Sequence, residues 1–213
     1  MAEFQPLPAG RHGLTRDEVR RSQRARLLRG MAEAVAEDGY PAATVAGVLK
    51  RVHVSRQTFY EHFTDKQDCF LAVLDESARG LAAALRDGVA AGGAGGEPVR
   101  PDRMVAAYLA AITEQPTFAR VFFLESAAAG LPAQRKRVEV QNLFTELMIE
   151  TFRGTPYWHT SPDPEFACRI LVGGVSSLVT AALVADGTGP PPDTAARIVA
   201  LVEQLFGTQG RAR

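Results

Sequence analysis

The chain has 213 residues, of which 46% are hydrophobic and 23% charged, so it can bury a sizeable core in one or two compact units. Its 24 basic and 24 acidic side chains cancel, yet residues 1–66 hold 11 Lys or Arg against 8 Asp or Glu, a net of +3 that leaves −3 for the remainder. The two cysteines, Cys69 and Cys168, lie far apart with no histidine beside either, which argues against a zinc site and gives no disulfide framework.

The chain begins with a segment that we expect to be a flexible arm, residues 1–14. This segment has several Pro and Gly residues and no apolar run, unlike a secretory signal, so nothing points to export and we expect a cytoplasmic protein. Thr15 and Glu18 then have the spacing of a capping box, which predicts that the first helix begins there. Residues 11–29 contain seven arginines and two acidic residues, and this local positive charge attracts phosphate without specifying a sequence.

Two short helices joined by a tight turn are predicted between Thr44 and Lys66. Thr44 is a good N-cap residue. It is followed by an apolar stripe at helical spacing: Val45, Val48, Leu49 and Val52. The stripe breaks at His53, and Ser55 supplies a second N-cap only a few residues later. Helices joined this closely must cross steeply, as in a helix-turn-helix.

The second helix of the pair is predicted to have one buried and one outward face. Phe59 and Phe63 are four residues apart and can share the buried face, which turns Arg56, Gln57 and Tyr60 outward. Arg can pair with guanine, Gln with adenine, and a Tyr hydroxyl can reach a phosphate. Short amphipathic helix pairs also occur in all-helical cores, so the pattern alone leaves DNA reading and ordinary core packing both open.

At these residues the chain resembles the TetR family of bacterial transcriptional regulators. The resemblance rests on the order and spacing of AEDGY at 36–40, ATV at 43–45, VSR at 54–56 and TFYEHF at 58–63, with Lys66 close behind. It covers about residues 17–74, while the remaining two-thirds is similar in architecture alone. His53 departs from the family by standing where a turn glycine is common, but His tolerates a positive φ better than most non-Gly residues.

The resemblance implies roles for particular side chains of this unit. Thr44, Tyr60 and Lys66 would contact phosphates, although Lys66 can also be an ordinary surface lysine. Asp65 can cap the helix that begins near Lys66, and a helix N-terminus favours an anion. The stretch from Ser55 to Thr58 would face base edges. The expected DNA-binding residues are Thr44, Ser55, Arg56, Gln57, Thr58, Tyr60, His62 and Lys66.

The remaining elements are also predicted to be helices, so the expected fold class is all-α. A three-helix DNA-binding unit with a helix-turn-helix, residues 15–65, is followed by a helical domain for effector binding and dimerisation, residues 66–213. An apolar stripe from Phe70 to Leu85 links the two, and a Gly-rich connector, residues 86–101, follows it. Proline or glycine separates five further helices, expected at 101–114, 117–128, 133–153, 164–185 and 193–206.

The middle helices are rich in large, adaptable side chains, and the family usually has a ligand pocket in this region. We therefore expect a hydrophobic small-molecule effector to bind there. The candidate ligand-binding residues are Met104, Tyr108, Phe118, Phe122, Glu125, Met148, Phe152 and Trp158. Core packing is the ordinary alternative for each of them. Glu125 follows an apolar run and can either meet a ligand donor or pair with an arginine such as Arg169.

The helix from Pro164 carries a small residue at every fourth position, which would let another helix approach closely. In the family the last two long helices pair with their copies, so the resemblance implies a homodimer. The candidate interface residues are Gly173, Ser177, Ala181, Ile198, Leu201 and Leu205. A helix in the core of one chain also needs small residues. The uncharged run 170–185 is shorter than the roughly 20 residues of a membrane span, so we interpret it as a buried helix and expect no membrane contact.

Motifs typical of enzymes are missing from the sequence, which contains no GxSxG elbow, HExxH pair, CxxC, GxGxxG or phosphate loop. We expect no catalytic residue, cofactor or metal. The prediction is a DNA-binding transcriptional regulator, a ligand-responsive repressor that acts as a homodimer on a partly palindromic double-stranded operator. The alternative is a helical small-molecule-binding protein without specific DNA recognition.

Overall fold

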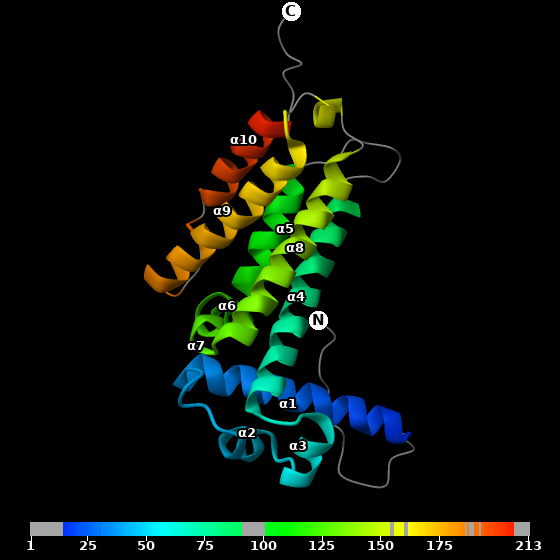
Figure 1. Cartoon of the computed structure of the whole chain (residues 1–213), viewed down its shortest axis with the longest axis vertical. Coiled ribbons are helices and arrows are strands. Elements are labelled where there is room, and N and C mark those ends of the chain that lie inside the picture. The colour runs from blue at the N-terminus through cyan, green and yellow to red at the C-terminus, as the bar shows by residue number, and fades with distance from the viewer. Residues whose placement is uncertain are drawn as a thin grey trace, which may run out of the picture. The chain divides into compact units, whose positions relative to one another are not determined.

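The computed structural model describes residues 15–90, 101–153, 156–159, 162–185, 187, 190–191 and 193–206. Within these ranges every regular element is a helix, which confirms the predicted all-α class (Figure 1). The chain forms two compact units, Met1–Val73 and Leu74–Arg213. The division falls inside helix α4 (Lys66–Ala90), whereas the sequence suggested one at the first residue of that helix.

The first unit contains α1 (Arg16–Asp38), α2 (Val45–Val52), α3 (Arg56–His62) and the start of α4. The predicted capping box closes α1, because the Glu18 N–H donates to Thr15 Oγ1 over 3.3 Å and the Thr15 N–H donates to the Glu18 carboxylate over 2.7 Å. The short helices begin at their predicted caps in the same way. The N–H of Gly47 donates to the Thr44 hydroxyl over 3.1 Å, and Ser55 caps α3.

Helices α1 and α2 approach closely at Gly30. A Cβ atom on this residue would lie only 2.3 Å from Cγ1 of Val52, so no larger residue fits without movement. The Arg26 guanidinium of α1 also donates to the carbonyl of Val52 at the end of α2. Leu27, Met31 and the other buried apolar residues of α1 complete the contact, which fixes the position of α2 within this unit.

The turn between α2 and α3 is made by a residue other than glycine. His53 has φ 50° and ψ 50°, a left-handed conformation, and its N–H donates to the carbonyl of Leu49. The predicted tolerance of this histidine for a positive φ is confirmed. Ser55 then starts α3 two residues later, so the two short helices are joined as the sequence indicated.

The second unit holds the rest of α4 and the remaining helices. They are α5 (Pro101–Glu114), α6 (Pro116–Arg120), the π-helical turn η1 (Val121–Glu125), α7 (Ser126–Ala128), α8 (Leu131–Arg153), the short 3-10 helix η2 (Pro156–His159), α9 (Pro164–Ala185) and α10 (Thr194–Phe206). In Figure 1, α8 runs beside α9, and α10 packs along α5. All five predicted helices are present, but the one expected at 117–128 begins at Pro116 and contains the unpredicted π-helical turn.

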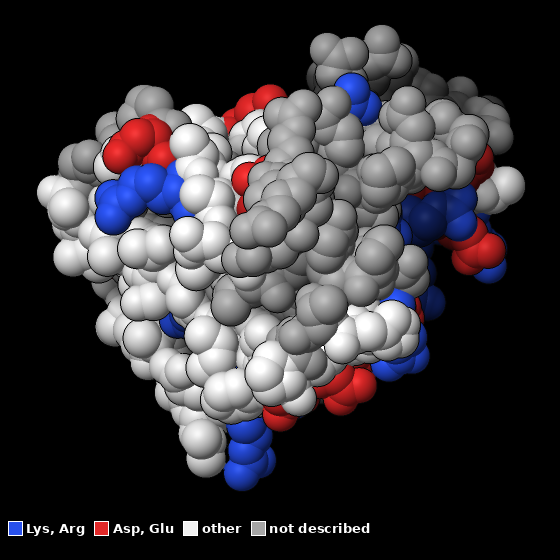
Figure 2. Space-filling model, turned by 90° about the horizontal axis from the view of Figure 1, so that it is seen from above, with Lys and Arg blue, Asp and Glu red and all other residues white. Residues whose placement is uncertain are grey.

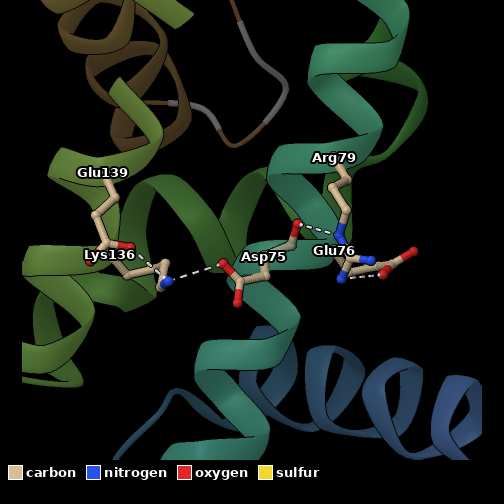
Figure 3. Close-up of polar contacts among 5 residues, drawn as sticks. All are labelled: Asp75, Glu76, Arg79, Lys136 and Glu139. Carbon is tan, nitrogen blue, oxygen red and sulfur yellow. Dashed lines mark hydrogen bonds and ion pairs between the residues drawn. The ribbon is translucent and has the colours of Figure 1, made fainter. Parts of the chain in front are cut away.

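An ion pair connects α4 to α8 inside the second unit, with further polar contacts within each of the two helices. The Lys136 ammonium of α8 lies 3.2 Å from the Asp75 carboxylate of α4 and 2.7 Å from Glu139 (Figure 3). Arg79, one turn after Asp75, donates to the Asp75 carbonyl and pairs with Glu76 over 3.0 Å. Because Asp75, Arg79 and Glu139 remain partly exposed, these contacts position the two helices without dominating the stability of the unit.

Helix α9 is buried on one side only, so the prediction of a buried helix is wrong for its other side. Ile170, Leu178 and Val184 are 56%, 51% and 70% exposed. Figure 2, which views the molecule from above, shows mostly uncharged side chains on its left-hand side, with a few charged ones among them. By length and composition, α9 is also the one helix among the described residues that could cross a membrane, a test that core helices of soluble proteins pass too.

Candidate nucleic-acid interface and ligand cavity

Helix α3 has the two faces that its sequence predicted. Phe59 and Phe63 are buried in the first unit and anchor the helix. Arg56, Gln57 and Tyr60 are exposed on the other side, and Tyr60 retains 48% of its accessible surface. A short helix that is fixed by two phenylalanines and presents a guanidinium, an amide and a phenol can place donors against bases and phosphates.

The exposed side chains of α3 are held by weak contacts on the helix surface. The Gln57 amide donates to Glu61 over 3.1 Å, and the Arg56 guanidinium carbon lies 5.7 Å from the centroid of the Tyr60 ring. Ser55 and Thr58 are less available, because their hydroxyls lie 2.9 Å apart and the Thr58 N–H donates to Ser55. Base contacts by all four residues from Ser55 to Thr58 therefore stay predictions, with Arg56 and Gln57 the best presented.

Lys66 has a structural role at the start of α4. Its ammonium donates to the carbonyls of Tyr40 and Ala43 over 2.8 and 3.0 Å, and it lies 4.2 Å from the centroid of the Tyr40 ring. These contacts fasten the loop before α2 to α4. A lysine has three N–H donors, of which two are used here, so the phosphate contact stays a prediction. The predicted cap of α4 is confirmed, since the Asp68 N–H donates to the Asp65 carboxylate over 2.8 Å.

His62, at the end of α3, combines burial with nearby positive charge. Its Nε2 atom is buried and has no hydrogen-bond partner among the residues that the structure describes. Burial lowers the pKa of this imidazole, and the charges of Arg20 and Arg24 lower it further. The ring is neutral at neutral pH, which limits it to a weak attraction for DNA unless a bound phosphate favours protonation.

A narrow apolar cavity of about 70 Å³ lies inside the second unit. Helices α4, α5, α8, α9 and α10 and the π-helical turn all contribute to its wall. The lining residues are Leu85, Met104, Val105, Tyr108, Phe122, Phe123, Val140, Gln141, Phe144, Met148, Leu171, Val172, Val175, Ser176, Ile198 and Val202. Four predicted ligand-binding residues are therefore placed in the wall of one cavity: Met104, Tyr108, Phe122 and Met148.

The other four candidates do not line this cavity. Phe118 faces a smaller space of about 20 Å³ beside α4. Phe152 is a buried core residue, and Trp158 packs against the same core cluster. Glu125 lies 3.8 Å from Arg120, so the predicted alternative of an arginine partner is confirmed, with Arg120 rather than the suggested Arg169 as that arginine. The three aromatic candidates lie elsewhere for one reason, because selection by size and aromatic character does not tell which side of a helix faces a cavity.

Several lining residues were missed by the sequence analysis. Leu85 lies near the end of the predicted stripe of α4, and the aliphatic residues of α9 resemble ordinary core residues. Gln141 could have been recognised in the sequence, because it is a polar residue on the apolar stripe of α8, between Val140 and Phe144. Ser176 on α9 is likewise a buried polar residue in an apolar row.

The candidate dimer residues differ in their exposure. Gly173, Ser177, Ala181 and Leu201 are exposed. Ile198 is only 6% exposed and lines the cavity, so its assignment to an interface between chains is corrected to the core of its own chain. Leu205 has a side chain outside the described part.

Family models match two parts of the chain. Residues 27–73 match the model described as bacterial regulatory proteins of the tetR family, and residues 100–206 match the tetracyclin repressor-like C-terminal domain. The second match alone spans half of the chain. Together they include α3 and most of the wall of the cavity.

Curated relatives match part of the chain. The transcriptional activator FasR of Mycolicibacterium smegmatis is 34% identical over 86 residues, 39% of this chain and 37% of FasR. The transcriptional repressor AcnR of Corynebacterium diphtheriae is 38% identical over 60 residues, 28% of this chain and 32% of AcnR. The matched segments therefore span about a third of each relative, and the two relatives differ in the direction of regulation.

Known structures share the whole fold at low identity. The fatty acid degradation regulator FadR of Bacillus halodurans aligns with a TM-score of 0.67 and 20% identity, covering 90% of this chain and 97% of that protein. FadR of Bacillus subtilis, in complex with stearoyl-CoA, aligns with a TM-score of 0.65 and 16% identity, covering 85% and 97%. At these identities the likeness shows the fold alone.

Proposed function

The chain belongs to the TetR family of bacterial DNA-binding transcriptional regulators, and from that membership we propose that it is a ligand-responsive repressor acting as a homodimer on a partly palindromic operator. The observation that carries this proposal is the surface of α3, where Arg56, Gln57 and Tyr60 are exposed above the buried Phe59 and Phe63. In this proposal Arg56 and Gln57 contact base edges, and Tyr60 and Thr44 contact phosphates.

The exposed side of α9 supports the homodimer. Its apolar side chains and the small residues Gly173, Ser177 and Ala181 would be covered by the same surface of a second copy, together with Leu201 of α10. Covering this face removes apolar surface from water, the main driving force of association. A two-fold dimer places its recognition helices in successive major grooves about 34–36 Å apart, which requires an inverted repeat in the DNA.

The cavity supports a hydrophobic small-molecule effector. It is almost entirely apolar, and Leu85 of α4 forms part of its wall. Because α4 is continuous with the first unit, a ligand that displaces Leu85 moves the helix that also carries the DNA-binding unit. The ligand releases DNA only to the extent that it binds the released conformation more tightly. A bacterial operator lies in the cytoplasm, so the protein acts there.

The test of this function is the selection of duplexes from a random DNA library by the purified protein at about 0.15 M salt, where nonspecific phosphate attraction is screened. We expect enrichment of an inverted repeat with half-sites about one helical turn apart. Folded protein that enriches no sequence would instead support a small-molecule-binding protein without specific DNA recognition.

The direction of regulation has its own test, in vitro transcription from a template that carries the selected operator. A repressor lowers the amount of transcript, because the bound dimer blocks the promoter. An increase on addition of the protein would make it an activator, as FasR is named.

A further inference from the structure

A guanidinium lies behind the apolar wall of the cavity. Arg137 of α8 donates to the carbonyl of Phe123 over 3.3 Å and reaches the hydroxyl of Ser176 over 3.5 Å. Its guanidinium carbon lies 5.9 Å from the centroid of the Phe122 ring. Phe122, Phe123 and Ser176 all line the cavity, so the charge of Arg137 stands directly behind three of its lining residues.

This charge has no anionic partner within the described part of the chain. Arg137 makes no ion pair with any described carboxylate. Burial lowers the pKa of its guanidinium, and the interaction with Tyr108 raises this pKa to a smaller extent. An arginine stays protonated in proteins, so the side chain is a half-buried cation. A half-buried cation held only by neutral acceptors has lost part of its hydration, so an anion placed beside it would be favoured.

The neighbouring polar groups are also placed as donors. The Gln141 amide and Arg137 both donate to the Ser176 oxygen, each over 3.5 Å, which leaves the Ser176 hydrogen to point elsewhere. The Tyr108 hydroxyl makes no hydrogen bond to any residue that the structure describes, and burial raises the pKa of this phenol. A phenol that keeps its proton can donate it. Tyr108, Gln141 and Ser176 are therefore the polar members of an otherwise apolar wall, and Arg137 adjoins this wall through Ser176.

The position of these residues on α8 supports a purpose beyond packing. Arg137 and Gln141 occupy the same helical stripe as Val140, Phe144 and Met148, a stripe that is otherwise apolar. An arginine that served only for solubility would lie on the opposite side of the helix. Its carbonyl contact is also made with the π-helical turn, a local distortion of the kind that is common at functional sites.

We propose, on the basis of the effector function proposed above, that the ligand is an amphipathic anion whose apolar chain fills the cavity and whose carboxylate or phosphate is bound by Arg137, with Gln141, Ser176 and Tyr108 as neutral donors. The free volume of about 70 Å³ is small compared with the roughly 300–1,000 Å³ of a pocket for a drug-sized ligand, so binding must widen the cavity. Met104 and Met148 in the wall are flexible side chains that can move aside.

The experiment compares decanoate with decanol and decylamine, which share the chain and differ in the charge of the head, and adds decanoyl-CoA. Binding to the full-length protein is followed by calorimetry and by the fluorescence of Trp158, the single tryptophan, which packs on the core cluster that includes the cavity residue Met104. We expect decanoate to bind about tenfold or more tightly than decanol, and decylamine most weakly. The comparison of decanoate with decanoyl-CoA distinguishes a carboxylate from a phosphate as the natural anion.

Variants of α8 locate the effect at one residue. Arg137→Gln should abolish the preference for the anion while decanol binds as before, whereas Arg137→Lys, which keeps the charge, should retain part of it. Arg135→Gln removes an exposed arginine of the same helix and should bind like the wild type. If Arg137→Gln does not fold, as judged by its circular dichroism, the role of Arg137 is tested by the binding of decanoate, decanol and decylamine to the wild type and to Arg137→Lys.

The inference is overturned if the wild type binds decanoate and decanol equally, or if the anion preference survives in Arg137→Gln. Failure of all four probes to bind also overturns it. None of these results bears on the operator, because the DNA selection requires no ligand and tests the proposed function separately.

Discussion

In the proposed function, different residues of α3 contact bases and phosphates, and two substitutions can separate these roles. Gln57→Ala removes an amide that can read adenine, so it should relax the preference at one base pair, at a cost of about 1–3 kcal/mol on the operator alone. Tyr60→Phe keeps the ring beneath Arg56 but removes the hydroxyl of the proposed phosphate contact, so it should weaken operator and unrelated duplex by similar factors, about 0.5–1.5 kcal/mol. Fluorescence anisotropy on the operator, its single-base variants and a random duplex measures both effects. The reverse pattern would refute the assignment of these two contacts.

His62 predicts how the stability of the DNA-binding unit depends on pH. Its folded-state pKa lies below the ordinary value of about 6.5, so the unfolded chain binds a proton before the folded one does. The stabilising contribution of the neutral ring is therefore complete above about pH 6.5 and is lost as the pH falls through that value towards the folded-state pKa. Urea unfolding at a series of pH values should show this loss in the wild type and a smaller loss in His62→Gln. Equal pH profiles would show that His62 is not responsible.

At the scale of single residues, the capping and turn residues could be predicted because they depend on local geometry. Thr15, Thr44 and Ser55 act within three residues of themselves, and His53 has to adopt the turn that its place between two helices demands. The wall of the cavity depends on which sides of five helices meet, and single-sequence patterns do not contain that information. Arg137 is an exception to this limit, because a charged residue within an apolar helical stripe can be recognised in the sequence.

The crossing of α1 and α2 requires a glycine, and a matched pair of substitutions tests this requirement. Gly30→Ala places a methyl group 2.3 Å from a stiff valine side chain, so it should destabilise the protein by about 1–3 kcal/mol. Gly80→Ala, in the middle of α4 with nothing within 4 Å of the added methyl, should stabilise it by about 0.5–1 kcal/mol. Urea unfolding followed by circular dichroism gives both values. Stabilisation by both alanines would mean that the close approach at Gly30 is easily relieved.

At the scale of whole elements, helix positions could be predicted from proline and glycine punctuation, but helix surroundings could not. Helix α9 has both termini where the sequence placed them, but its composition indicated only a buried helix and did not distinguish burial within one chain from burial between two copies. The π-helical turn Val121–Glu125 leaves no local pattern, because the same residues would also form an ordinary α-helix.

The whole molecule is predicted to assemble through the exposed face of α9. Leu178→Glu would place a charge in the proposed interface and should shift sedimentation at micromolar concentration from dimer to monomer. Val138→Glu is the matched control, since Val138 of α8 is 55% exposed and lies outside the proposed interface, and it should leave the dimer intact. A wild-type monomer under these conditions, or dissociation by both variants alike, would refute assembly through α9.

Regulation by a ligand makes a final prediction that concerns both units at once. If a ligand that occupies the cavity weakens operator binding by some factor, thermodynamic linkage requires that the operator weaken ligand binding by the same factor, commonly about 5–150-fold. The dissociation constant of the ligand should therefore rise in the presence of saturating operator and remain unchanged with a scrambled duplex of equal length. Calorimetry with decanoate, or with whichever ligand proves to bind, gives one factor, and anisotropy with labelled operator gives the other.

Leu85 is the residue of α4 that lines the cavity, so Leu85→Ala should weaken the coupling between ligand and operator. Both factors should then decrease towards one by the same amount. Two factors that change independently would show that ligand and DNA do not share a conformational equilibrium, and α4 would then be a connector without a regulatory role.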